Sequence, residues 1–454
     1  MAEPNAHLQW HPTCAPRAET GAGRTDDIWF VDPQIGWAVP NGTGQIIKTT
    51  DGGVSWIPQR LPEGTNVYWR CLGFATPQRG WAGTLTGPVG ATPGRRLYAT
   101  TDGETWELID ARLPAEAPAA ICGLSVVNEQ VVYASGTNFP NRPAAMVKTT
   151  DGGETWTGWD MGEHATLLVD TYFTTPERGW VVGGKANVAN PTRDDVKPVV
   201  LFTADGGDSW ENRVADLEDA FPFGEWGWKI QFLNDQVGFV SLENFEDAAI
   251  LRTSDGGLTW QRHVVNDPQG NANLEGIGFV DAQHGWVGGW GDELFTGGFS
   301  SETVDGGTNW QNANHIGKFL NRFRFFGDPV TVGYASGDTV YKYSAEPVIC
   351  PELEAALAGP QLLDEAAPVA VTRPIAIGFT IPPGARRLTI EVWDRFGEPV
   401  RELVDETDPA SGHRSVTWDF TSDAGAPLPD GYYIYRVTID GAAESRIVHV
   451  KTPS

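Results

Sequence analysis

The chain has 454 residues and a formal net charge of −27, and 40% of its residues are hydrophobic. This length exceeds one ordinary domain, and the 54 glycines and 32 prolines favour a turn-rich, all-β protein over a helical one. The acidic balance argues against nucleic acid as a partner, and the absence of any run of about 18 apolar residues argues against a membrane span.

The N-terminus and the cysteines bear on the compartment. Residues 1–5 are polar and lack the apolar core of a secretion signal. We interpret this start as that of a cytoplasmic protein or of one whose signal was removed, and the C-terminal domain described below favours the second reading. Four cysteines without a Cys-x-x-Cys motif permit two disulfides and disfavour a zinc site.

One motif, Thr-x-Asp-Gly-Gly-x-(Ser/Thr)-Trp, occurs six times at spacings of 50 or 54 residues, which indicates a repeat architecture. In each copy the aspartate can accept hydrogen bonds from turn amides, and the glycines supply positive φ, so each copy predicts a hairpin. We expect a structural role for the six aspartates, which are Asp51, Asp102, Asp151, Asp205, Asp255 and Asp305. Two copies differ: Asp102 is followed by a single glycine, which predicts a tighter or bulged turn, and Asn309 takes the Ser/Thr position of the last copy.

A second signature precedes the motif by about twenty residues in each repeat. An apolar strand ending in Phe is followed, after five residues, by Gly and an aromatic residue, as in Phe30-x5-Gly36-Trp37, Phe74-x5-Gly80-Trp81, Phe173-x5-Gly179-Trp180, Phe232-x5-Gly238-Phe239 and Phe279-x5-Gly285-Trp286. Variants occur at 126–133 and 326–334. Two hairpins per repeat give four strands, the content of a propeller blade, so we predict an all-β, seven-bladed β-propeller over residues 7–345.

Seven first hairpins but six motifs leave the last blade without an outer strand. Residues 7–12 resemble 259–263, and we expect them to pair with 339–343 and close the ring, which removes two exposed sheet edges. Cys14 and Cys350 lie just beyond these two strands and form the preferred disulfide. A second bridge, between Cys71 and Cys122 at the start of adjacent inner strands, is the weaker expectation.

The repeat pattern stops after residue 345. Residues 346–371 form an Ala/Pro-rich linker with a short helix expected at 351–357, and 372–454 predict a β-sandwich with strands at 375–381, 387–393, 400–404, 415–420, 432–439 and 445–451.

Both domains resemble known families. The repeated motif is the Asp-box, and the combination of Gly-Trp-x-x-Gly with it resembles the photosystem II stability/assembly-factor family; sialidases, sortilin-type receptors and xyloglucan-active glycosidases share the box more loosely. The C-terminal domain resembles the Ig-like module of the flagellar-hook capping protein and the sorting domains of type IX secretion, through Gly397–Val404, Gly412–Asp419 and Gly425–Arg436. This second resemblance implies a secreted or surface-attached protein, although Phe420 stands where that family usually has glycine.

The loops on one face of the predicted propeller are long, and this face is the expected working surface. We call the first residue of each copy of the second signature the inner-strand marker. Counting back four residues from each marker places seven residues around the mouth of the central channel, with Arg324 one step deeper. The seven are Asp26, Arg70, Cys122, Val169, Trp228, Glu275 and Arg322. The arginines either pair with the surplus of acidic residues or form a site for an anion or a carboxylate. The assembly-factor resemblance implies an arginine patch, without a residue-by-residue match.

Five tryptophans lie outside both signatures, in or beside these loops: Trp69, Trp159, Trp226, Trp228 and Trp290. They either cover blade interfaces or stack on a sugar or a partner's side chain. Clustered acidic residues suggest the alternative of a glycosidase pair, which would come from Asp216, Glu218, Asp219, Glu225, Glu243, Glu246 and Asp247.

We therefore predict a secreted or surface-attached, non-enzymatic protein that binds a protein or glycan partner through the loop-rich face. The alternative is a secreted glycoside hydrolase of the sialidase or xyloglucanase-like Asp-box class. No cofactor, metal or catalytic residue is assigned, and a monomer is expected.

Overall fold

The computed structural model describes residues 8–18, 24–41, 44–85, 95–138, 142–291, 297–350, 374–394, 399–429 and 431–450. The chain divides into two compact units, Met1–Val348 and Ile349–Ser454. Residues 351–373, which include most of the predicted linker and its short helix, lie outside the described residues. No helix in the described ranges is long and apolar enough to cross a membrane.

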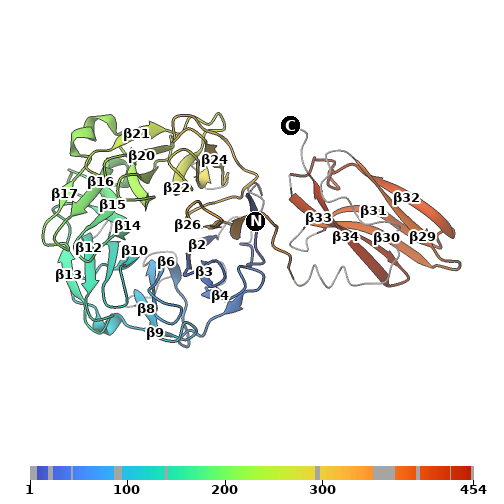
Figure 1. Ribbon diagram of the computed structural model, residues 1–454, viewed down its shortest axis with the longest axis horizontal. Helices are drawn as coiled ribbons and strands as arrows, with labels where there is room; N and C mark the ends of the chain where they lie inside the picture. Colours follow the sequence, from blue (N-terminus) through green and yellow to red (C-terminus); the bar gives the residue numbers. More distant parts are fainter. Residues whose placement is uncertain are drawn as a thin grey trace. The chain divides into compact units, whose positions relative to one another are not determined.

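The first unit is a ring of seven four-stranded antiparallel sheets, so the predicted seven-bladed propeller is confirmed (Figure 1). Blades one to three are β2 (Thr25–Phe30), β3 (Gly36–Pro40), β4 (Ile47–Thr49), β5 (Ile57–Pro58); β6 (Tyr68–Phe74), β7 (Gly80–Leu85), β8 (Leu97–Thr100), β9 (Trp106–Leu108); and β10 (Ala120–Val126), β11 (Val132–Asn138), β12 (Arg142–Thr149), β13 (Thr157–Asp160). Blades four to six are β14 (Leu167–Phe173), β15 (Gly179–Lys185), β16 (Lys197–Thr203), β17 (Glu211–Asn212); β18 (Trp226–Phe232), β19 (Gly238–Glu243), β20 (Ala249–Thr253), β21 (Gln261–Val264); and β22 (Ala272–Phe279), β23 (Gly285–Gly291), β24 (Ser300–Thr303), β25 (Gln311–Asn312). Blade seven is β26 (Phe323–Phe326), β27 (Val332–Ser336), β28 (Val340–Ser344) and β1 (Gln9–Pro12). Short 3-10 helices lie at η1 (Asp110–Arg112), η2 (Arg193–Asp195) and η3 (Ala215–Ala220).

The second signature is explained by packing between and within blades. A Cβ on Gly36 would approach the Phe30 ring to 2.3 Å, so glycine lets the ring lie flat on the backbone of the returning strand. The aromatic residue after the glycine then stacks on the Phe of the next blade, as Trp37 does on Phe74 with ring centroids 3.7 Å apart. Tyr334 of the last blade stacks in the same way on Phe30 of the first, at 3.6 Å.

The Asp-box turns are hydrogen-bonded as predicted. Asp51 Oδ1 accepts from the Thr49 hydroxyl (2.8 Å) and from the Ser55 amide (2.9 Å). In the second box the Gly103 amide donates to a hydroxyl three residues earlier rather than four, so this turn is one residue tighter. In the last box the side-chain amide of Asn309 donates to Asp305 (2.7 Å) and replaces the usual hydroxyl.

The box aspartates predict acid sensitivity. Hydrogen bonds, led by the one from the Thr105 amide, hold the pKa of Asp102 at about 2, and the pKa of the other five box aspartates is also lowered. A folded pKa below the unfolded value gives stability that is present above about pH 4 and is lost as the pH falls through the folded pKa. We therefore expect the melting temperature of the propeller to fall between about pH 4 and pH 2, measured by thermal unfolding of the full chain. A melting temperature that stays constant to about pH 2 would contradict this stabilisation.

Residues at the two ends of the first unit close the ring. β1 pairs antiparallel with β28, with Trp10 opposite Tyr343, and forms the outer strand of blade seven. The Trp10 ring packs edge-on against Trp286 of blade six, 5.4 Å away. Cys14 and Cys350 are both disulfide-bonded, and neither Cys71 nor Cys122 belongs to a disulfide, so the bond joins Cys14, just after β1, to Cys350, a few residues after β28. The expected second bridge, between Cys71 and Cys122, is wrong: the two residues lie on adjacent inner strands, and the Cys71 thiol donates instead to the backbone oxygen of Ile121 (3.4 Å).

The second unit contains a four-stranded sheet in the order β31-β30-β33-β34 and a two-stranded sheet, β29-β32. Its strands are β29 (Ile375–Ile381), β30 (Arg387–Asp394), β31 (Pro399–Thr407), β32 (Gly412–Trp418), β33 (Gly431–Ile439) and β34 (Ala442–Val450). One apolar core, which includes Trp418 and Phe379, lies between the sheets, as in the predicted sandwich. Phe420 takes the left-handed conformation (φ 61°) that explains the glycine usual at this position, and its ring packs edge-on against Trp418.

Candidate functional site

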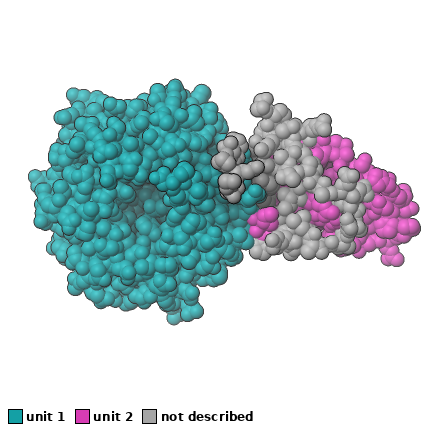
Figure 2. All heavy atoms as spheres, viewed as in Figure 1, with its two compact units in different colours: residues 1–348 teal, residues 349–454 magenta. Residues whose placement is uncertain are grey.

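The inner strand of each blade lines the central channel, which is visible as a hollow in the space-filling view (Figure 2). Six of the seven inner strands contain a register shift near their start, where one residue of the neighbouring strand faces two. We call the side where inner strands begin the loop face, and the side of the Asp-box turns the turn face. In these six strands the shifts give two layers of channel residues. The upper layer is Asp26, Arg70, Cys122, Val169, Trp228 and Glu275, and the lower layer is Asp27, Cys71, Gly123, Asp170, Lys229 and Gly276. In blade seven, Asn321 and Arg322 lie just before β26 and join the upper and lower layers through hydrogen bonds to Asp26 and Asp27.

The upper layer holds a buried charge network. Asp26 accepts from Arg24 Nε (2.7 Å) and from Arg70, and the second carboxylate, Glu275, accepts from Arg24. All four side chains are less than 5% exposed. Burial alone would raise the pKa of Asp26, but Arg70 and Arg24 outweigh burial and lower it, so two cations and two carboxylates balance here.

Three tryptophans stack on three arginines at the loop-face mouth. The guanidinium carbon of Arg24 lies 4.3 Å from the ring centre of Trp290, and that of Arg70 lies 4.6 Å from Trp228. The third stack joins Arg193 to Trp226 at 4.2 Å. These residues line a pocket of about 330 Å³ together with Tyr68, Leu85, Cys122, Leu167, Val169 and Glu275; we call it the loop-face pocket.

Hydrogen bonds fix the two tryptophans of the pocket that are partly exposed. Trp290 Nε1 donates to Glu275 Oε1 (2.7 Å), and Trp228 Nε1 donates to Asn321 Oδ1 (3.2 Å). With both N–H groups satisfied, the rings present mainly their apolar surfaces, and they are ordered before any ligand arrives.

Arg193 reaches the mouth from the long 185–197 loop of blade four. Its guanidinium binds Glu243 (2.5 Å), which is 3% exposed at the end of β19. Burial and the nearby Glu275 raise the pKa of Glu243 against the opposing effect of Arg193. An elaborated loop therefore completes the pocket, and it places a carboxyl group that tends to keep its proton.

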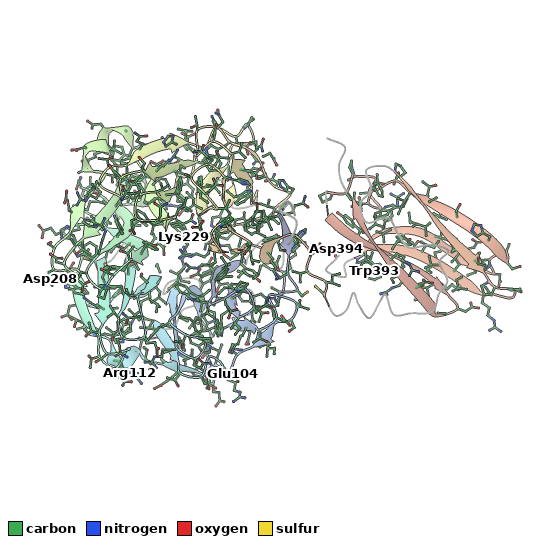
Figure 3. The ribbon with its side chains drawn as sticks, viewed as in Figure 1. Glu104, Arg112, Asp208, Lys229, Trp393 and Asp394 are labelled. Carbon is green, nitrogen blue, oxygen red and sulfur yellow. The ribbon has the colours of Figure 1, made fainter. Side chains whose placement is uncertain are left out.

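The lower layer holds a second network. Arg322 donates through Nη1 and Nη2 to both oxygens of Asp170 (2.9 and 2.8 Å) and through Nε to Asp27 (3.0 Å). Burial alone would raise the pKa of Asp170, but Arg322 and Lys229 lower it. Lys229 is 1% exposed and lies near the middle of the ring (Figure 3).

The position predicted for Arg322 is wrong by one layer. A Cβ on Gly333 would approach the Phe325 ring to 2.5 Å, so Phe325, not Phe326, is the inner-strand marker of blade seven. Four residues before it, Asn321 takes the mouth position and donates to the Asp26 backbone oxygen (2.6 Å). Arg322 and Arg324 therefore lie on the turn-face side and do not converge with Arg70 at the mouth.

Trp69 covers a blade interface, which is the first of the two roles predicted for it. It is fully buried, packs edge-on against Tyr98 and donates to the Gly44 backbone oxygen (3.0 Å). The neighbouring register shift directs Arg70 into the channel and leaves Trp69 in the core between blades one and two. Trp159 lies on the outer strand β13, against the core between blades three and four. The structure gathers the other predicted residues, Arg70, Trp226, Trp228, Glu275 and Trp290, in the loop-face pocket.

The candidate acids do not gather in the same way. Glu225 is buried and forms two hydrogen bonds to Arg262 (3.0 and 2.7 Å). Asp216, Glu218 and Asp219 are exposed on η3, and Glu246 and Asp247 are exposed on a turn capped by Asn244. Glu243 alone among the seven adjoins the pocket lining, through Arg193. Within the described residues no group of three or more His, Cys, Asp or Glu side chains is placed to hold a metal.

Sequence reasoning missed Arg24, Arg193, Asp27, Asp170 and Lys229. Asp170 and Lys229 each interrupt an apolar inner strand, Leu167–Phe173 and Trp226–Phe232, and a charge in such a strand signals a buried pair. Arg24 and Arg193 lie in connections without a repeated pattern, so no sequence signal placed them.

Comparison with known proteins supports both domain resemblances. A family model described as the FlgD Ig-like domain matches residues 366–443. No curated protein is significantly similar to the chain. Among solved structures, one described as YCF48 bound to D1 peptide has a TM-score of 0.51 at 17% identity, covering 76% of this chain and 99% of its own.

Two further structures are similar. YCF48 from Cyanidioschyzon merolae has a TM-score of 0.51 at 17% identity, covering 74% of this chain and 98% of its own. The GH74 enzyme of Niastella koreensis has a TM-score of 0.52 at 12% identity, covering 96% of this chain and 73% of its own. At sequence identities this low, the similarity shows a shared fold and nothing about a shared ligand or activity. The chain is thus a seven-bladed β-propeller, similar in structure to YCF48, followed by a FlgD Ig-like domain.

Proposed function

We propose that this protein is a non-enzymatic binding protein, secreted or attached to the cell surface, whose loop-face pocket recognises a protein or glycan partner. The observation that carries the proposal is the ring of three arginine–tryptophan stacks around a preformed pocket of about 330 Å³. The guanidinium groups of Arg24 and Arg70 are held by buried carboxylates, so this side of the pocket offers rigid aromatic surface rather than free charge. Such surface suits a sugar ring or an apolar side chain, because both lose little entropy on stacking against a fixed ring.

The proposal of a protein partner gains support from the propeller's structural relatives. A YCF48 structure of the same fold is described as bound to a D1 peptide, which illustrates peptide binding by such a propeller. Proteins that share a fold bind different ligands, so the partner of this chain is identified by the binding experiment below.

The proposed location rests on two features. The FlgD Ig-like domain and the disulfide between Cys14 and Cys350 are both consistent with an extracytoplasmic protein. We propose that the C-terminal domain serves export or attachment, as its resemblance to sorting domains implies, and leaves the propeller free to bind.

Trp228→Ala tests the proposal. On arrays of glycans and of peptides, we expect the wild-type full chain to bind a defined set of ligands and the variant to bind the same set at least tenfold more weakly, the loss typical of a central aromatic contact. Trp393→Ala is the matched control, since Trp393 is also partly exposed and stacked by an arginine, Arg436, but lies in the C-terminal unit (Figure 3). Equal binding by wild type and Trp228→Ala would contradict the proposal.

A glycoside hydrolase is the second candidate, because Glu243 combines a raised pKa with a position near a second carboxylate, Glu275. Hydrolases need one protonated and one ionised carboxyl group. Incubating the array glycans with the protein distinguishes the two functions: product formation that Glu243→Gln abolishes would favour the enzyme, whereas binding without products favours the binding protein.

A further inference from the structure

A second cavity lies at the other end of the channel, away from the loop-face pocket. Its volume is about 590 Å³, and its lining includes Lys229, Arg322 and Arg324. Turn residues of blades five, six and seven, such as Asn234, Asp281 and Asp328, also line it, so it opens on the turn face; we call it the turn-face cavity. Its size is that of a small-molecule site.

Positive charge exceeds negative charge inside this cavity. Three cationic side chains, Lys229, Arg322 and Arg324, interact with two buried carboxylates, Asp27 and Asp170, which leaves one positive charge in excess. Asp281 and Asp328 are exposed at the rim, where solvent screens them. An unbalanced buried cation is unexpected in a chain with a net charge of −27.

The hydrogen bonds show which side chain carries the surplus positive charge. Arg322 uses Nε and both terminal nitrogens on the two carboxylates. The carboxylates also accept backbone amides, from Leu72 to Asp27 (2.9 Å) and from Ile230 to Asp170 (3.2 Å). Lys229 Nζ, although buried, has no hydrogen-bond partner among the described residues. Leaving an ammonium group buried without a partner is costly, and an anion would remove that cost.

Arg324 supplies the second available cation. It forms no ion pair within the described ranges; its Nε donates to the Ile28 backbone oxygen at 3.5 Å, and its guanidinium lies 4.1 Å from the Trp29 ring centre. Trp29, Tyr172, Phe232 and Phe325 are partly exposed aromatic residues of the cavity wall. The cavity thus contains two cations, neither of which is hydrogen-bonded to a carboxylate, and an aromatic wall beside them.

We propose that the turn-face cavity binds a small organic anion, a carboxylate carried on an apolar body, with Lys229 and Arg324 facing the carboxylate and the aromatic wall facing the body. This site is independent of the loop-face pocket and of the partner proposed for it. A carboxylate there would balance the excess positive charge of the lower layer. Burial and Arg322 also lower the pKa of Lys229 to about 8, so a bound anion would help the amine to keep its proton near neutral pH.

Isothermal titration calorimetry of the full chain tests the proposal with three carboxylates, acetate, benzoate and 3-phenylpropionate, each at up to about 10 mM. We expect 3-phenylpropionate to bind most tightly and its uncharged amide to bind at least tenfold more weakly. Lys229→Met and Arg324→Gln should each weaken binding of 3-phenylpropionate by about tenfold or more. Lys229→Met removes a buried charge that has no hydrogen-bond partner, so the melting temperature of this variant should not fall below that of the wild-type protein. A loss of binding in this variant is therefore not explained by a loss of folding.

Lys342→Met is the control for the lysine variant. Lys342 lies on β28 and donates to the Gly52 backbone oxygen (3.0 Å), outside the cavity, and its removal should leave binding unchanged. Three results would each overturn the proposal: no binding of any of the three carboxylates, equal affinity for 3-phenylpropionate and its amide, or affinity that neither Lys229→Met nor Arg324→Gln changes.

Discussion

Replacing Arg322 by alanine is expected to lower the free energy of unfolding of the propeller by about 3–5 kcal/mol. Arg322 joins Asp170 of blade four to Asp27 of blade one across the channel, and all three side chains are at most 10% exposed. The variant leaves two carboxylates buried without their main cation, which costs far more than the loss of the ion pair itself. Chemical denaturation of the full chain, followed by tryptophan fluorescence, measures the change.

Arg112→Ala is the matched control for this prediction. Arg112 lies at the outer edge of the ring (Figure 3) and pairs with Glu107 (3.4 Å) and Glu154 (3.8 Å), both 69% exposed. Exposed pairs of this kind contribute at most about 1 kcal/mol. Similar losses in the two variants would show that the channel network does not stabilise the ring.

Removal of the disulfide should cost roughly 2–5 kcal/mol in the double variant Cys14→Ser, Cys350→Ser. The bond closes a loop that contains nearly the whole propeller, so its loss greatly increases the freedom of the unfolded chain. It also frees β1, which holds the outer edge of blade seven by four residue pairs with β28. We expect a lower denaturation midpoint and faster exchange of the amide hydrogens of β1 and β28.

Cys71→Ser provides the comparison, because Cys71 is a free, buried thiol and its replacement leaves the bond intact. A reducing agent should destabilise the wild-type protein and leave the double variant unaffected. If reduction leaves the midpoint of the wild-type protein unchanged, the closure contributes no stability.

The repeats predicted most of the fold because each signature reflects a local physical requirement. The glycine of Phe-x5-Gly follows from a ring that packs on the strand backbone, and the Asp-box aspartate follows from the amides of its turn. The seventh blade was harder, since its turn has a different length and two adjacent phenylalanines, Phe325 and Phe326, both fit the marker. Only the contact between Gly333 and Phe325 decides between them.

The candidate site was predicted in part. Arg70, Trp228 and Glu275 were placed at the mouth by counting along the inner strands, which is possible wherever blades repeat. Trp290 was assigned to the same face because it lies in or beside its loops. The register shift in six of the seven inner strands brings the following residue into the channel as well, and this shift depends on pairing with the next strand. Sequence therefore did not reveal that Lys229 follows Trp228 into the channel, or that Arg193 reaches Trp226 from a loop.

The central claim, that the loop face is the binding surface, is tested most directly by hydrogen–deuterium exchange of the full chain with and without a glycan or peptide found on the arrays. We predict slower exchange in the loop-face segments 185–197, 214–225 and 264–274 and at the start of β18, with the Asp-box turns unchanged. Protection confined to the Asp-box turns or to the C-terminal unit would contradict the claim.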